Sequence, residues 1–426
     1  MPWLETHVMD QRVQFIAAFL KDESSVAELC RQFQISRKTA YKWIARYQAL
    51  GARGLDDLTR APHTHPNQFS DQQIWTILQA RDKHPLWGPR KLLKIVIGNS
   101  DPDGWPSRST VANWLRTHGR AIGRKKRRRV PPHSQPLSHA TGPNSLWCCD
   151  FKGWFCTGDG CKCHPLTITD AFSRYLLRCQ GLLATGFETV RPIFEAAFRE
   201  YGLPEAIRSD NGPPFASRAV AGLSLLNIWW IRLGIRHERI DPGKPQQNGR
   251  HERMHLTLKQ ETANPPERSF ARQQQRMDGF GEEYNELRPH EALDMATPAS
   301  VYHPSPRPFP SRLAEIEYPD GWQLRKVASA GDFYWKHQPV FVSETLYRQT
   351  IGLEPLDERY WRAYFGPVFL GVLDTRQPRM LNGAALRRLD RKRAHAGLAT
   401  AAPEPAGTPS AALQESPQAE AKVSPM

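Results

Sequence analysis

Three acidic residues, far apart along the chain, stand where carboxylates could do chemistry. Asp150 lies in an apolar segment with strand character, where an ionised side chain is costly unless it binds something. Asp210 ends a second such segment in an Asp-Asn-Gly turn, and Glu252 falls on the first turn of a predicted helix that follows Asn248-Gly249. Carboxylates from separate elements hold pairs of divalent ions about 3.5–4 Å apart for displacement at a phosphodiester.

We therefore interpret Asp150, Asp210 and Glu252 as both catalytic residues and metal ligands. The expected cofactor is a pair of Mg²⁺ ions, with Mn²⁺ as a substitute, because Mg²⁺ binds a few carboxylates plus substrate phosphate oxygens. One ion would activate water or a DNA 3′-hydroxyl, and the other would stabilise the leaving oxygen. Plainer interpretations exist, since Asp-Asn-Gly is a good turn by itself and Lys152 could satisfy Asp150.

Two rival metal motifs occur in the same region. The run His251-Glu252-Arg253-Met254-His255 matches H-E-x-x-H, the zinc-protease signature. Its place at a helix start, without an obvious third ligand, makes a zinc protease a remote alternative. Cys156, Cys161, Cys163 and His164 form the second group, but their spacing is not a usual zinc knuckle and ordinary hairpin cysteines are favoured.

The elements that would position the carboxylates form a mixed sheet covered by helices. Alternating apolar residues and turn signals predict five strands, at residues 146–154, 165–170, 175–183, 206–209 and 236–240. Helical periodicity predicts three helices between and after them, at residues 189–201, 219–233 and 247–263. This order predicts an α/β architecture.

The sequence on the N-terminal side of these elements predicts DNA-binding units. Residues 10–50 fit three helices, with Ser36 as N-cap of the third, and the short second connection is typical of a helix-turn-helix. A second small helical unit follows from Phe69 to Leu115. Six consecutive cations at residues 124–129 then form an arm suited to phosphates. Solvated charges or a solubilising linker are the plainer interpretations.

The C-terminal third predicts a different architecture. Short aromatic-rich strands recur after Pro304-Ser305-Pro306, and a small β-barrel is the simplest way to close them. Residues 394–426 are rich in Ala, Pro, Ser and Glu without an apolar face, which predicts a disordered tail.

Composition points to a polyanionic partner. The 426 residues carry 58 Lys and Arg against 43 Asp and Glu, a net charge of +15, which favours nucleic acid. Seven cysteines without a framework pattern predict reduced thiols. With no apolar run long enough for a membrane span and no secretory signal, we expect a cytoplasmic protein without a membrane partner.

The order of motifs resembles the insertion-sequence DDE transposases that have a retroviral-integrase-type catalytic core. The matching segments are Trp147 to Lys152, Thr169 to Arg174, Ser209 to Gly212, Gln247 to Arg253, and Tyr284 to Leu293. This resemblance implies a ribonuclease-H-like fold, binding to terminal inverted repeats, and DNA cleavage with strand transfer in bacteria, near the nucleoid. It also implies a homodimer or larger synaptic assembly on double-stranded DNA from the element ends and the target.

Together these features predict a multidomain α+β chain. The expected domains are a helix-turn-helix domain at 1–55, a second helix-turn-helix-like domain at 68–120, a basic linker at 121–143, an integrase-type catalytic core at 144–302, a small β-barrel at 310–380 and the tail at 394–426. The residues expected to bind DNA are Arg37, Lys38, Thr39, Lys42, Arg108, Arg124, Lys125, Lys126, Arg127, Arg128, Arg129, Arg250, Arg253 and Lys259.

One departure from the family pattern affects the third carboxylate. Between Asp210 and Glu252 lie 41 residues, several more than in better-known members, and the excess is expected in residues 222–230. The other acidic candidates for the third ligand are Glu238, Asp241 and Glu261. A DNA-binding regulator without catalysis is the alternative function.

Overall fold

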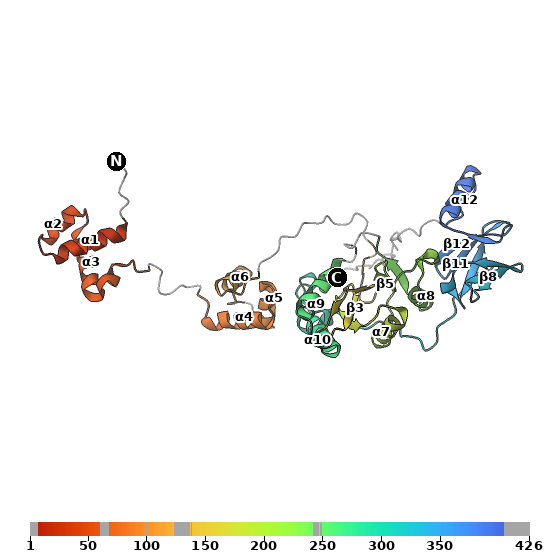
Figure 1. Ribbon diagram of the computed structural model, residues 1–426, viewed down its shortest axis with the longest axis horizontal. Helices are drawn as coiled ribbons and strands as arrows, with labels where there is room; N and C mark the ends of the chain where they lie inside the picture. The colour runs from red at the N-terminus through yellow and green to blue at the C-terminus, as the bar shows by residue number, and fades with distance from the viewer. Residues whose placement is uncertain are drawn as a thin grey trace, which may run out of the picture. The chain divides into compact units, whose positions relative to one another are not determined.

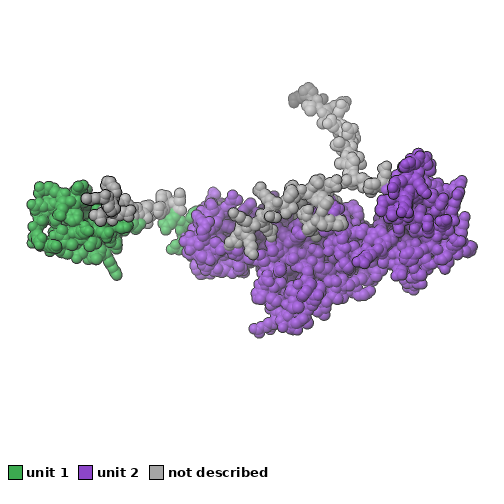
Figure 2. Space-filling view, turned by 45° about the horizontal axis from the view of Figure 1, so that its top comes forward, with its two compact units in different colours: residues 1–72 green, residues 73–426 purple. Residues whose placement is uncertain are grey.

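The computed structural model describes residues 7–59, 68–98, 101, 103–122, 137, 139–241, 247 and 249–403. The chain divides into two compact units, residues 1–72 and residues 73–426, which Figure 2 shows in different colours. The expected basic arm at 124–129 lies outside the described residues.

The first unit consists of short helices around a small core. Its elements are α1 (Val8–Leu20), α2 (Val26–Gln32), α3 (Arg37–Leu50) and the 3-10 turn η1 (Gly51–Leu55). Ser25 and Glu28 form a capping box at the start of α2, and Ser36 accepts the backbone N–H of Thr39 (3.1 Å) at the start of α3. The three expected helices and the Ser36 cap are therefore present, around a core of Phe15, Ile16, Leu29, Ala40, Trp43 and Ile44.

Three more helices follow and enclose a second small core. They are α4 (Asp71–Lys83), α5 (Pro89–Ile97) and α6 (Arg108–Thr117). Pro89 occupies the first position of α5, where its missing N–H costs nothing, and Ser107 caps α6 by accepting the N–H of Thr110 (3.3 Å). Their shared core contains Ile77, Leu78, Trp87, Leu92, Val111 and Leu115.

A mixed six-stranded sheet occupies the centre of the second unit. Its strands are β1 (Trp147–Phe151), β2 (Phe155–Cys156), β3 (Lys162–Asp170), β4 (Leu176–Leu182), β5 (Ala206–Ser209) and β6 (Arg236–Arg239). The order is β2-β3-β1-β5-β6, and β4 also pairs with β3. β1 runs antiparallel to β3 and parallel to β5, which in turn is parallel to β6. The expected mixed sheet is confirmed.

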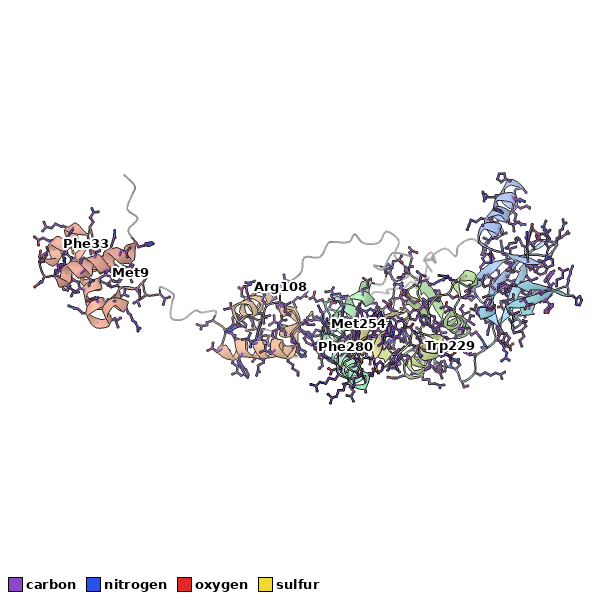
Figure 3. The ribbon with its side chains drawn as sticks, in the orientation of Figure 1. Met9, Phe33, Arg108, Trp229, Met254 and Phe280 are labelled. Atoms are coloured by element: carbon purple, nitrogen blue, oxygen red, sulfur yellow. The ribbon has the colours of Figure 1, made fainter. Side chains whose placement is uncertain are left out.

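Helices cover both faces of this sheet (Figure 1). The helical elements are α7 (Phe187–Tyr201), η2 (Val220–Gly222), α8 (Leu225–Arg232), α9 (Gly249–Thr262), α10 (Phe270–Glu282), the π-helical turn η4 (Glu283–Leu287), η5 (Glu291–Leu293) and α11 (Pro298–Val301). α7 and α8 pack on one face in the main core, which contains Trp147 and Trp229. Met254 of α9 and Phe280 of α10, labelled in Figure 3, share a separate cluster with Leu176 of β4. Within the described ranges, no helix is long and apolar enough to cross a bilayer.

The C-terminal strands do not form the expected closed barrel. The elements are β7 (Gln323–Lys326), β8 (Asp332–Trp335), β9 (Gln338–Phe341), η6 (Glu344–Leu346), β10 (Thr350–Pro355), β11 (Tyr360–Phe365), β12 (Val368–Asp374), β13 (Arg379–Leu381) and the helix α12 (Gly383–His395). In the described residues, five strands form an open sheet in the order β13-β12-β11-β10-β7, and β8 and β9 form a separate hairpin. A barrel needs its edge strands to pair, whereas here packing of the hairpin against the sheet buries the core.

The first residues of the expected disordered tail at 394–426 have a described structure. α12 continues to His395, and Ala401 is fully buried. Arg362 Nε donates to the carbonyl of Ala401 (2.8 Å), and Asp390 Oδ1 accepts its N–H (2.6 Å). Backbone groups of residues 399–402 are therefore bound by side chains of α12 and β11, while residues 394–400 are exposed. Residues 404–426 lie outside the described residues.

Candidate active site

Asp150 lies in β1 on the sheet face that α9 covers. Side chains alternate along a strand, and Trp147 belongs to the core on the α7 and α8 face, so Asp150 lies on the other face. Its Oδ2 is 3.7 Å from Nδ1 of His255 in α9. Burial, followed by the negative charge of Asp210 and more weakly that of Glu252, raises the pKa of Asp150 to about 7. A bound cation would reverse this shift.

Asp210 directly follows β5 and lies level with Asp150. The parallel register pairs Trp147 with Ile207 and Cys148 with Arg208, so two residues further on the two aspartates stand at the same end of adjacent strands. Asp210 Oδ1 is buried and accepts no hydrogen bond, and burial raises the pKa of this side chain. A Cβ at position 212 would lie 3.1 Å from Oδ2, so Gly212 leaves room beside the carboxylate.

Glu252 stands on the first turn of α9 with an exposed side chain. Lys259, seven residues later, is exposed on the same side of the helix. The other acidic candidates already have partners in their own surroundings. Glu238 pairs with Arg208 (2.9 Å), Glu261 pairs with Arg288 (2.8 Å), and Asp241 accepts the Gln247 side-chain amide (3.1 Å). Glu252 therefore remains the preferred third carboxylate.

The two histidines of the H-E-x-x-H motif are buried and form hydrogen bonds with threonines of β3. His251 and His255 are 2% and 3% exposed, and each directs Nε2 at the Thr167 hydroxyl (2.7 and 2.6 Å). Nδ1 of His251 also bonds the Thr169 hydroxyl (2.9 Å). Burial lowers the pKa of His251 to about 3, so both rings stay neutral and anchor α9 to β3. Glu252 points elsewhere, so this arrangement does not favour a zinc protease.

The cysteine cluster belongs to the β2–β3 hairpin. Phe155 pairs with Cys163 across this hairpin, which puts Cys163 in the interior while Cys156 is exposed. Asp159 holds the turn by accepting the Thr157 hydroxyl (2.5 Å) and the backbone N–H of Phe270 (3.0 Å). These contacts favour the ordinary hairpin interpretation.

The aspartate pair fits a hard divalent cation. An ionised oxygen that is buried without a hydrogen-bond donor, such as Oδ1 of Asp210, is stabilised by a metal ion, and carboxylates are the ligands that Mg²⁺ prefers. In the described part of the chain, however, no three His, Cys, Asp or Glu side chains are gathered closely enough to hold an ion. The structure thus brings Asp150 and Asp210 together. Glu252 does not join them in a common group, and its negative charge only contributes to the raised pKa of Asp150.

The expected DNA-binding residues whose side chains the structure describes lie on three helices. Arg37, Lys38 and Lys42 are exposed on the first turns of α3, whereas the Thr39 hydroxyl bonds the Ser36 cap (2.9 Å). Arg108 is exposed at the start of α6, as Figure 3 shows. Arg253 and Lys259 are exposed on α9. The side chain of Arg250 and residues 124–129 lie outside what the structure describes.

The sequence did not predict that α4 and α5 contact the central domain. His84 Nδ1 is 2.9 Å from Glu283 Oε1, and the Arg288 guanidinium lies 5.8 Å from the centre of the Trp87 ring. Burial and the charge of Arg288 lower the pKa of Lys91 to about 8. These partners are about 200 residues apart, so no local pattern could have revealed them.

Family models match both parts of this architecture. Two models of an integrase core domain match residues 140–245 and 233–298. A helix-turn-helix domain model matches residues 11–63, and a homeodomain-like domain model matches residues 39–115.

Two bacterial insertion-element proteins are similar to the chain. The IS407 uncharacterized 31.7 kDa protein of Burkholderia multivorans is 30% identical over 200 residues, which cover 45% of this chain and 68% of the relative. The IS476 uncharacterized 39.2 kDa protein of Xanthomonas euvesicatoria is 33% identical over 183 residues, 41% of this chain. The chain spans 49% of the length of that second relative. Among solved structures, the HTLV-2 integrase catalytic core domain in complex with magnesium is 19% identical, with a TM-score of 0.30, over 39% of this chain and 100% of that chain.

Proposed function

Because this chain belongs to the family of insertion-sequence transposases that carry an integrase core domain, we propose that it moves a mobile element. In this proposal it binds the terminal inverted repeats of the element and catalyses metal-dependent DNA cleavage and strand transfer. Asp150, Asp210 and Glu252 form the DDE catalytic set.

The observation that carries the proposal is the aspartate pair at the matching ends of β1 and β5. One of its oxygens is buried without any donor, which favours a cation ligand over a structural acid. Glu252 completes the set from the first turn of α9, where a small shift of the helix start would bring it toward the aspartates. When bound, Mg²⁺ or Mn²⁺ would neutralise the charge that develops on the scissile phosphate.

The protein's own groups supply positioning. Arg253 and Lys259 extend from α9 near Glu252, where they hold phosphates of the DNA end in place. His251 and His255 fix the helix on β3 through the two threonines, which sets the direction in which Glu252 projects. Phosphoryl transfer without a covalent enzyme intermediate gains its rate from such positioning and from electrostatics.

The domains divide the work. Residues 1–55 and 68–120 read the element end, the linker at 121–143 follows the DNA backbone, and the core at 144–302 carries the chemistry. The C-terminal domain at 310–380 follows as a β-rich module. Because two element ends must be joined to one target, at least two copies of the chain assemble on DNA. We place this assembly in the bacterial cytoplasm, at the nucleoid.

A strand-transfer assay with a duplex carrying the element end and Mg²⁺ tests the catalytic set. Asp150→Asn, Asp210→Asn and Glu252→Gln should each lower the rate at least about a hundredfold, because each removes a ligand charge, while end binding stays intact. Glu261→Gln on the same helix is the matched control. It should keep activity, because the Glu261 carboxylate binds Arg288 and is not expected to bind a metal ion.

The same assay separates the alternatives. Strand transfer that survives both Asp150→Asn and Glu252→Gln contradicts the assigned set. A wild-type protein that binds ends without ever cutting them would instead be a regulator. In a separate assay without DNA, Zn²⁺-dependent hydrolysis of casein would support the zinc-protease alternative.

A further inference from the structure

The helix α12 has two sides of opposite character. Leu389 and Arg393 are buried against the sheet, and Leu386 is partly buried beside them. The outer side carries four exposed cations, which are Arg387, Arg388, Arg391 and Lys392. Residues four apart lie on the same side of a helix, so these residues form two adjacent rows. None of the four has an acidic partner among the described residues.

The rest of the domain holds α12 firmly in place. Arg393 pairs with Asp357 and donates from Nε to the carbonyl of Ala399 (2.8 Å). Asp390 accepts the N–H of Ala401 (2.6 Å), which folds the following segment back onto the helix. Figure 1 shows α12 projecting from the sheet beside β12. These contacts fix the helix that carries the four cations. They offset the repulsion between like charges four residues apart, which weakens a helix.

The residue types on the outer side of α12 favour a partner that presents phosphates. Its exposed side chains are four long cations, alanines and a histidine, with no amide or hydroxyl group among them. Flexible cations bind phosphates whatever the sequence. A membrane surface fits poorly, because the apolar side that would enter the lipid already faces the sheet.

The start of α12 also borders on the catalytic domain. Asn382, Gly383 and Leu386 line a groove of about 830 Å³ together with Arg218, which belongs to the segment that follows Asp210.

We propose that the exposed side of α12 binds the backbone of the target duplex. This inference rests on the proposed function, because a transposase must hold a target of varied sequence as well as its own ends. The element ends are read by the N-terminal helices, which leaves the sequence-independent surface for the target.

The test measures binding of the full-length protein to a random-sequence duplex by fluorescence anisotropy at several salt concentrations. Arg387→Gln combined with Arg391→Gln should weaken binding about tenfold and lower the slope of log affinity against log salt by about 1.8, the value for two lost phosphate contacts. Arg312→Gln combined with Arg376→Gln removes two exposed charges outside the helix and should change affinity less than about twofold. Arg387→Lys combined with Arg391→Lys keeps both charges and should bind as the wild type does.

Unchanged affinity and slope in the α12 variant would overturn the proposal, provided that its melting temperature matches that of the wild type. A loss seen only with a duplex from the element end, or an equal loss in the control variant, would also overturn it. Preferential binding of α12 to phosphatidylserine vesicles would assign the surface to a membrane. Since binding is read without catalysis, a protein that failed to transfer strands would still report on α12.

Discussion

Among single residues, the contrast between Asp170 and Asp210 separates a structural acid from a candidate ligand. Asp170 is fully buried, and its carboxylate accepts the N–H groups of Asn144 and Ser173 (2.8 and 2.7 Å) and the Ser173 hydroxyl (2.7 Å). These bonds build the turn between β3 and β4. Asp210 has a buried oxygen without any donor, which is the state expected of a group whose partner is a cation.

The raised pKa of Asp150 predicts a stability effect. The ordinary pKa is 3.8 and the folded value is about 7, so ionisation opposes folding increasingly from about pH 4 and fully above about pH 7. Asp150→Asn should therefore raise the melting temperature of the metal-free protein by a few degrees at pH 8 and leave it unchanged near pH 3. Calorimetry with and without Mg²⁺ checks this, and the wild type should gain more from Mg²⁺ than the variant. A variant less stable than the wild type at pH 8 would contradict the burial of an unpaired charge.

The sequence was sufficient to place Asp150 in a strand and Asp210 at the end of another, but not to predict their surroundings. Alternation in β1 and the turn after β5 are local signals, so Asp150 and Asp210 could be predicted from them. The bonds from His251 and His255 to Thr167 depend on how α9 lies across β3, which is a tertiary property. For this reason a motif that resembles a zinc site could not be rejected from the sequence alone.

At the scale of elements, the cap of α3 links folding to DNA binding. Ser36→Ala removes the acceptor for the Thr39 N–H and should cost about 1 kcal/mol of stability. The first turn, which carries Arg37 and Lys38, would then fray, so affinity for an element-end duplex should fall several-fold. Thermal unfolding and anisotropy measure the two effects.

Ser25→Ala is the matched control for this prediction. It removes the equivalent cap of α2 but leaves the exposed start of α3 intact, so it should lower stability without the loss of affinity. Equal affinities in the two variants would contradict the assignment of α3 as a recognition helix.

Elements with a strong local pattern were predictable, and those built on distant contacts were not. The strand at 206–209 and the helix that became α9 followed from periodicity and flanking turns. α12 escaped prediction because its buried side depends on Arg393, which becomes acceptable in the interior only through Asp357. The expected barrel was wrong because strand patterns do not determine whether edge strands pair. In the segment between Asp210 and Glu252, residues 220–232 contain η2 and α8, and Leu223 and Ile228 join the core of the C-terminal domain. The extra length expected there thus coincides with a packing contact.

At the scale of the whole molecule, positive charge is spread over several parts of the chain. The net charge of +15 is distributed over the helical units, the exposed side of α9 and the outer side of α12. The contacts of His84 and Trp87 with Glu283 and Arg288 connect α4 and α5 to the catalytic domain. Binding of an element end to these helices would thereby bring the DNA toward Glu252.

The most direct test is to locate the metal. Crystals of the full-length protein with an element-end duplex and Mn²⁺, measured near the manganese absorption edge, reveal each ion through its anomalous scattering. We expect manganese peaks between the carboxylates of Asp150 and Asp210, with Glu252 as the third ligand, and loss of these peaks in Asp210→Asn. Manganese bound elsewhere on the protein, with no peak between the two aspartates, would contradict it.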